Sequence, residues 1–199
     1  TRSSKGFVIK NAIWLEGQGA DPSETKVRYS TGNGVYYALV ISNSLAKVSN
    51  VLVSNNASTT PDSNGGIWLW QGLVDGCVVT NCNAQNSSGT RKAGGGIRME
   101  GGTVRNSTIA KCERTRYTGG GIWMGSSSCL VENCRIVGCK ENYDASSKGG
   151  GIYASNGRIR NCLITGCSCY GTGLGVYLAG STVMENCTVA NCTNTKNNS

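Results

Sequence analysis

The stretch GGGIWMGSSSCLVENCRIVGC, residues 119–139, recurs in similar form as GGGIYASNGRIRNCLITGC, residues 149–167. Each copy runs from a glycine cluster through an aliphatic residue to an Asn-Cys pair, and it ends at a second Cys five residues later. Self-similarity at a period of roughly 20 to 50 residues indicates a repeat architecture. The sequence therefore predicts a fold made by stacking one unit.

The glycine clusters recur along most of the chain. They are Gly32-Asn33-Gly34, Asn64-Gly65-Gly66, Gly94-Gly95-Gly96, Gly119-Gly120-Gly121, Gly149-Gly150-Gly151 and Gly173-Leu174-Gly175. The aliphatic residues that follow them are Val35, Ile67, Ile97, Ile122, Ile152 and Val176. These aliphatic positions are 32, 30, 25, 30 and 24 residues apart, which predicts loops of variable length on a fixed frame.

A second recurring position carries an amino acid that tolerates a left-handed backbone. It is occupied by Asn50, Gly76, Asn106, Asn133, Asn161 and Asn186. Asn and Gly are the residues that adopt positive φ most readily. Their interchange at one position indicates a tight turn and not a ligand site.

The segments between these turns alternate apolar and polar residues with a period of two, which is typical of strands. Units that cannot bury a face alone must stack on one another. We therefore predict one all-β domain over residues 1–199, a right-handed parallel β-helix of six to seven coils with three short strands per coil. The domain would be either part of a longer solenoid or a unit that stacks end to end, since an open coil exposes strand edges.

A column of alternating charge supports this alignment. The residues just before the turn are Asp75, Arg105, Glu132, Arg160 and Glu185. Opposite charges on neighbouring strands stabilise a sheet, and like charges destabilise it. We interpret this column as structural.

The outward position after each aliphatic residue predicts a second column, which is rich in aromatic residues. Its members are Tyr36, Trp68, Arg98, Trp123, Tyr153 and Tyr177, with Trp70 and Glu100 beside it. A contiguous apolar surface often marks an interaction site, so this set is the candidate binding site for a glycan or a protein partner. Alternatively, aromatic residues simply pack well on a sheet or lie beneath a loop.

The eleven cysteines fall mainly into two inward columns. One contains Cys77, Cys134, Cys162 and Cys187, and the other contains Cys82, Cys112, Cys139, Cys167 and Cys192. Stacked Cβ vectors run parallel and do not converge as a disulfide requires, so most thiols are expected to be reduced core residues. Cys169 lies outside the columns and is the one candidate for a reactive thiol.

Composition excludes several classes of function. The chain has no histidine, which removes Ser-His-Asp catalysis and the common histidine metal sites. Its net charge of +8 would suit an acidic partner or would simply belong to a solvated surface. We expect no cofactor, no metal, no nucleic-acid partner and no membrane insertion.

The Gly-Gly-Gly-Ile units, the Asn turns and the Asn-Cys segments resemble the pectate-lyase-like right-handed β-helix superfamily. They are also similar to the repeats of bacterial polymorphic outer-membrane proteins and related adhesins. The resemblance extends from about Phe7 to Thr193, and it implies the fold but not one function. The hydrolases of the superfamily need clustered aspartates, whereas Asp occurs here only at four scattered positions.

Three functions remain open at this point. The first is a non-catalytic extracellular or cell-surface module, adhesin-like or structural and bacterial in origin, which binds through the aromatic column. The second is a polysaccharide lyase with Arg98 or Lys92 as base and Glu100 assisting. The third is a filament subunit that associates with itself end to end.

Overall fold

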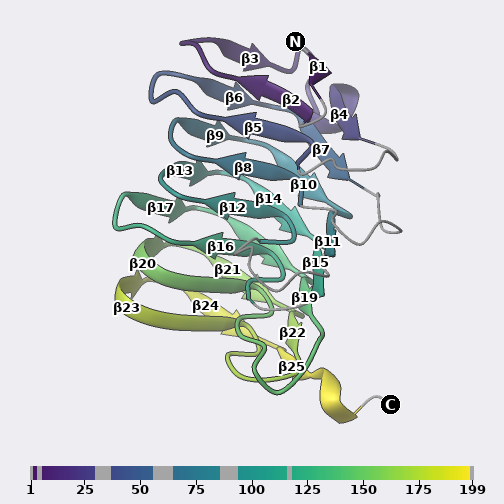
Figure 1. Ribbon diagram of the computed structural model, residues 1–199, viewed down its shortest axis with the longest axis vertical. Helices are drawn as coiled ribbons and strands as arrows, with labels where there is room; N and C mark the ends of the chain where they lie inside the picture. Colours follow the sequence, from purple (N-terminus) through teal and green to yellow (C-terminus); the bar gives the residue numbers. More distant parts are fainter. Residues whose placement is uncertain are drawn as a thin grey trace.

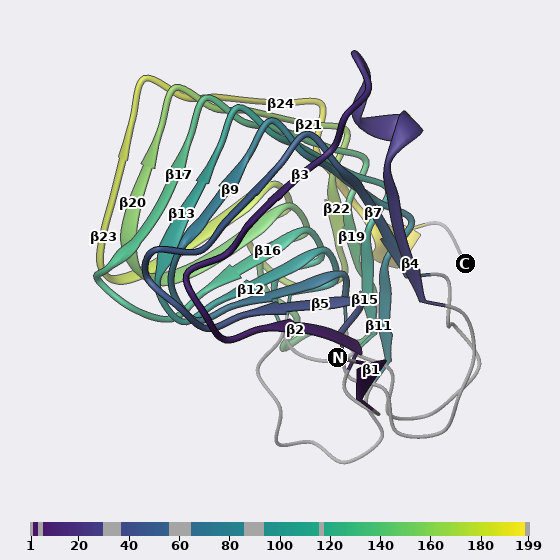
Figure 2. The same ribbon diagram turned by 90° about the horizontal axis from the view of Figure 1, so that it is seen from above.

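A computed structural model describes residues 2–3, 6–29, 37–55, 65–85, 94–115 and 118–197. The chain winds as a stack of coils whose equivalent strands pair in parallel (Figure 1). Viewed from above, the coils form similar outlines around one interior, and each outline is displaced from the next (Figure 2). The prediction of an all-β parallel solenoid is therefore confirmed.

The first sheet is folded at a corner and supplies two faces of every coil. Its first face contains β2 (Gly6–Ile9), β5 (Leu39–Ile41), β8 (Ile67–Leu69), β12 (Ile97–Met99) and β16 (Ile122–Met124). Its second face contains β3 (Trp14–Glu16), β6 (Lys47–Ser49), β9 (Leu73–Asp75), β13 (Gly102–Arg105) and β17 (Cys129–Glu132). The long strands β20 (Ile152–Arg160) and β23 (Val176–Glu185) turn the corner and belong to both faces.

Two further sheets complete the coil. The third face contains β4 (Lys26–Tyr29), β7 (Leu52–Asn55), β10 (Val78–Thr80), β14 (Thr108–Ala110), β18 (Arg135–Val137), β21 (Leu163–Thr165) and β24 (Thr188–Ala190). The fourth face contains β11 (Asn83–Gln85), β15 (Glu113–Thr115), β19 (Lys140–Glu141), β22 (Ser168–Cys169) and β25 (Thr193–Asn194). Among the described residues, five coils thus carry strands on all four faces, one strand more than the three predicted for each coil, and two N-terminal coils carry them on three.

Three short elements lie outside this scheme. Strand β1 (Arg2–Ser3) pairs with β2 in antiparallel orientation. The 3₁₀ helix η1 (Pro22–Glu24) begins at a capping box, in which Asp21 and Glu24 satisfy each other's backbone N–H groups. A second 3₁₀ helix, η2 (Thr195–Asn197), follows the last strand. None of the described helices is long and apolar enough to cross a membrane.

The interior consists of aliphatic columns. Ile97, Ile122 and Ile152 are register partners on successive coils, and all three are fully buried. Each coil buries its inward residues only because the coils above and below cover them, as expected for a solenoid. This stacking is the geometry on which the predicted surface columns depend.

The Asn positions form the predicted left-handed turns. All six turn residues have φ between 50° and 60°. Their side chains also bond along the stack, since Asn161 Nδ2 donates to Asn133 Oδ1 (3.2 Å) and Asn133 Nδ2 donates to Asn106 Oδ1 (3.4 Å). Both Asn and Gly can adopt the backbone conformation of this corner. Asn also stabilises it through side-chain hydrogen bonds between coils.

In the five clusters that the structure describes, the last glycine has a packing role. A Cβ on Gly66 would lie 2.7 Å from Cys82 Sγ, and one on Gly96 would lie 3.0 Å from Cys112 Sγ. Gly121, Gly151 and Gly175 approach the corresponding thiols in the same way. The last glycine of a cluster therefore packs directly against a thiol of the second cysteine column. A larger residue at the glycine would push the two segments of the chain apart.

The predicted register is wrong at one coil. Leu39 pairs with Ile67, and Val40 pairs with Trp68. The sequence pattern places Val35 and Tyr36 at these levels, and both residues lie outside the described residues. The glycine cluster at residues 32–34 therefore does not mark the start of the strand in this coil.

Candidate functional site

The outward column of the first face is in register, apart from its first member. Parallel pairing aligns Trp68 with Arg98, Arg98 with Trp123, Trp123 with Tyr153, and Tyr153 with Tyr177. We call these five residues the aromatic stripe. Tyr36, which the sequence placed at its end, is outside the described residues, and Val40 occupies that level.

At one end of the stripe, three rings cluster around Trp68. The Trp68 ring lies 4.9 Å from that of Trp70 and 5.3 Å from that of Tyr37, measured between centroids. Trp70 is 47% exposed, whereas Tyr37 is 2% exposed. The cluster therefore has one ring open to solvent and one ring beneath it.

The guanidinium of Arg98 lies between two indoles. Its Cζ is 4.7 Å from the centroid of Trp68 and 5.5 Å from that of Trp123. Arg98 Nε also donates to Glu100 Oε1 at 2.8 Å, and Arg98 Nη2 forms an ion pair with the same carboxylate. Cation–π contacts and a charge-assisted pair thus fix this cation in one place.

Trp123 shares the column but not the exposed surface. Only 3% of the residue is accessible. A Cβ on Gly125 would collide with the six-membered ring of Trp123, so the indole occupies the space that the missing side chain leaves. At this position the alternative reading applies, in which the aromatic ring packs on the sheet, and the ring contacts the guanidinium of Arg98.

The other end of the stripe is a pair of stacked phenols. The rings of Tyr153 and Tyr177 are 5.5 Å apart and almost parallel, with an interplanar angle of 3°. Lys148 Nζ lies 4.8 Å from the centroid of Tyr177. Both tyrosines are partly exposed, and Lys148 adds a second cation that the sequence analysis did not identify.

Comparison with known proteins bears on this fold. The family model described as "Right handed beta helix region" matches residues 33–199, which is most of the chain. The protein belongs to the right-handed β-helix family. Neither the search of curated proteins nor the search of solved structures gave a match. The family establishes the handedness of this β-helix, and it leaves the function to be argued from the site.

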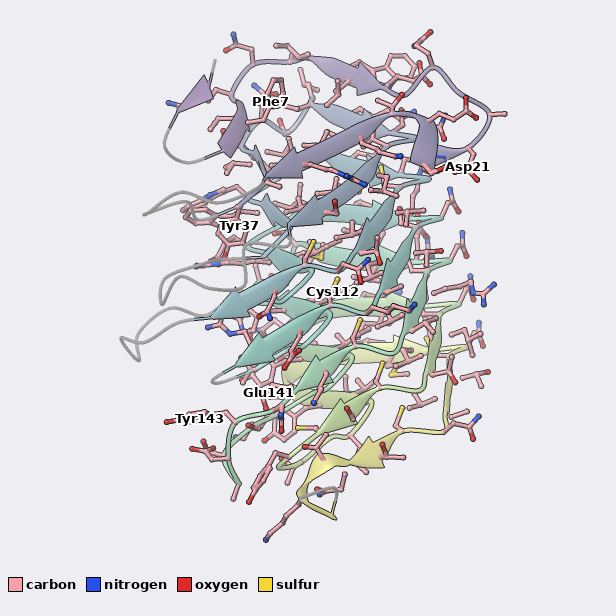
Figure 3. All side chains as sticks on the ribbon, turned by 90° about the vertical axis from the view of Figure 1, so that its right-hand side faces the viewer. Phe7, Asp21, Tyr37, Cys112, Glu141 and Tyr143 are labelled. Carbon is pink, nitrogen blue, oxygen red and sulfur yellow. The ribbon has the colours of Figure 1, made fainter. Side chains whose placement is uncertain are left out.

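The sequence analysis did not identify a buried polar column on the fourth face of the β-helix. Register places Arg114 beside Glu141, and Glu141 beside Cys169. All three residues are fully buried, and Glu141 and Tyr37 lie along the same edge of the molecule (Figure 3). Cys169 had been the candidate for an exposed reactive thiol, and this is wrong, because burial raises its pKa to about 11.

The thiols of this β-helix are free and mostly buried. Figure 3 shows the sulfur of Cys112 within the stack, and burial raises the pKa of this thiol well above its usual value. Each column thiol instead donates to a backbone carbonyl, as Cys134 Sγ does to Glu132 O at 3.1 Å. The described residues contain no group of three or more His, Cys, Asp or Glu side chains placed to hold a metal ion.

The charge column of the β-helix is confirmed as a set of contacts between coils. Arg105 Nη2 is 2.9 Å from Asp75 Oδ2, and Arg160 Nη2 is 2.6 Å from Glu132 Oε2. Glu185 is paired with Arg158 at 3.2 Å. These carboxylates are held by cations on neighbouring coils, which suits a structural role and does not suit acid–base catalysis.

Proposed function

We propose that this β-helix is a non-catalytic binding module, which binds a glycan on the aromatic stripe together with Trp70. The observation that carries the proposal is the stripe itself. Trp68, Arg98, Trp123, Tyr153 and Tyr177 are register partners on successive coils, and exposed Trp70 packs beside Trp68. Partly exposed rings held by rigid strands provide a preorganised surface for the apolar faces of sugars.

Arg98 and Glu100 add polar groups in the middle of this surface. Both side chains are partly exposed, at 18% and 25% respectively. A binding site of this kind combines apolar area with a few fixed polar groups that set orientation. We therefore assign Trp68, Trp70, Arg98, Glu100, Tyr153 and Tyr177 to ligand contact, and Trp123 to support of Arg98.

The lyase alternative has weaker support. A lyase needs a base that can lose its proton, whereas a guanidinium keeps its proton and Arg98 is further held by Glu100. Lys92, the other candidate base, is outside the described residues. Incubation with acidic polysaccharides, followed by absorbance of the unsaturated product, would detect lyase activity.

A relationship to the pectate-lyase-like superfamily and to the repeats of outer-membrane adhesins is part of this proposal. It is supported by the Gly-Gly-Gly-Ile units and the Asn turns, and it is the basis for proposing a cell-surface or extracellular location in a bacterium.

The experiment is a glycan-array screen followed by calorimetric titration of the best oligosaccharide. Replacing both Trp70 and Tyr177 by Ala in one variant should weaken binding by at least about tenfold, since each ring contributes roughly 1 kcal/mol or more to the binding free energy. Trp14→Ala is the matched control, because Trp14 is 61% exposed but lies on the second face, over Lys47. If the wild type, the variant without the Trp70 and Tyr177 rings and Trp14→Ala bind the oligosaccharide equally well, the stripe is not the binding site.

A further inference from the structure

Two buried donor groups beside the stripe have no acceptor oxygen in the described part of the chain. They are Tyr37 Oη and Trp68 Nε1. The two residues pack in one cluster, with ring centroids 5.3 Å apart. Buried donors are normally paired, because leaving them unpaired is unfavourable. Two such donors in one cluster therefore indicate a place for an acceptor oxygen.

The surroundings of Tyr37 favour a negatively charged acceptor. Burial raises the pKa of Tyr37, so its hydroxyl keeps its proton and remains a donor at neutral pH. The charges of Arg98 and Arg114, together with a hydrogen-bond contribution from Arg98, lower the pKa of this hydroxyl, whereas the charge of Glu100 raises it by less. Two cations and one carboxylate therefore influence this point, and the balance favours an anion.

Arg98 has donors left for such a group. A guanidinium carries five N–H donors, and Glu100 engages those on Nε and Nη2. The Arg98 side chain is also a hydrogen-bonding neighbour of Tyr37, which places this guanidinium at the phenol oxygen. Because the side chains of Arg98 and Glu100 are partly exposed, this edge of the cluster is connected to solvent.

We propose that Tyr37 Oη, Trp68 Nε1 and the Nη1 edge of Arg98 form an oxyanion subsite, which binds a carboxylate or sulfate group of the saccharide held on the stripe. The inference rests on the proposed function and deepens it, because it names an acidic group as the feature that is recognised. Carboxylate and sulfate present the same acceptor chemistry, so the probes must separate them.

The direct test follows the indole N–H signal of Trp68 by NMR of protein labelled with ¹⁵N. The chain has four tryptophans, and the signal of Trp68 is assigned by its loss in Trp68→Phe. Sodium glucuronate and glucose 6-sulfate are the anionic probes, and glucose is the neutral probe. We expect one or both anions to shift this signal downfield, and glucose to leave it unchanged. The anion that acts identifies the group.

The second test removes one donor. Tyr37→Phe deletes only the hydroxyl. It should weaken binding of the anion that shifts the Trp68 signal by about tenfold or more, since hydrogen bonds to charged groups are stronger than those between neutral groups. Affinity for glucose should not change. Tyr143→Phe is the control, because Tyr143 is exposed and lies outside the stripe.

The outcomes separate this inference from the proposed function. Unchanged anion affinity in Tyr37→Phe, or an equal shift of the Trp68 signal by glucose, overturns the subsite. If saccharides still bind and Trp70→Ala weakens them, the proposed function stands without it. If the anions shift Trp68 but no saccharide depends on Trp70, the subsite stands and the proposed function fails. If no probe shifts Trp68, the subsite is wrong.

Discussion

Replacing Gly66 by Ala should destabilise the protein through one identifiable contact. The new methyl group would lie 2.7 Å from Cys82 Sγ, and 3.0 Å from both Gly96 O and Val79 Cγ1. Overpacking of this kind costs about 1–3 kcal/mol of unfolding free energy. The sulfur is the nearest atom, so we expect it to contribute most of the strain.

A second substitution tests that assignment. Cys82→Ala alone should cost about 1 kcal/mol, because it removes one buried atom of methylene size. In the double variant, the methyl of residue 66 occupies space that the sulfur has left. The two costs should therefore not add, and the coupling should be about 1–2 kcal/mol in favour of the double variant.

The assay is equilibrium unfolding in urea under reducing conditions, followed by circular dichroism and tryptophan fluorescence. Gly76→Asn is the control, because no atom lies within 4 Å of a Cβ at Gly76 and Asn occupies the equivalent turn in other coils. It should change stability by less than about 0.5 kcal/mol. Additive costs at Gly66 and Cys82 would show that the glycine is required for another reason.

Three further predictions concern the charge column and the cysteine columns. Burial alone would raise the pKa of Asp75, but hydrogen bonds and charges from neighbouring coils outweigh it and lower the pKa. Its stabilising effect should be complete above about pH 4 and be lost as pH falls through the lowered folded value, so melting curves of wild type and Asp75→Asn should converge in acid. Glu132→Arg should cost about 1–2 kcal/mol in urea unfolding, and adding Arg160→Glu should not restore stability, because each residue then faces a like charge; recovery in the swap would indicate an isolated pair. Ellman's reagent should modify Cys187 and Cys192 in the folded protein and the other nine thiols only after unfolding, since those nine are buried; modification of more than two would contradict the buried columns.

Much of the fold could be predicted because two constraints repeat at fixed places. A left-handed turn accepts Asn or Gly almost alone, so Asn50 and Gly76 could be recognised as equivalent. Strand alternation then determined which residues point inward. The register of the coil that contains Leu39 could not be fixed in this way, because the first strand begins nine residues before the turn at Ile67 but eleven before it at Ile122.

The candidate site was less predictable from the sequence. The burial of its outward side chains depends on segments between the strands, and these segments do not repeat from coil to coil. Tyr37 lies beside Trp68 although nothing in its position along the chain pairs the two residues. Cys169 had the spacing of a loop residue, yet it is buried next to Glu141. Only the ladder positions, whose neighbours are fixed by stacking, could be assigned from the sequence.

The charge column has a consequence for how this protein can change in length. Excising one coil, such as the one that carries Arg105, would bring Asp75 against Glu132, two residues of the same sign. Excising two adjacent coils would join Asp75 to Arg160 and preserve the alternation. Gain and loss of units should therefore be tolerated in even numbers more readily than in odd numbers, which gives the molecule a parity rule for its own evolution.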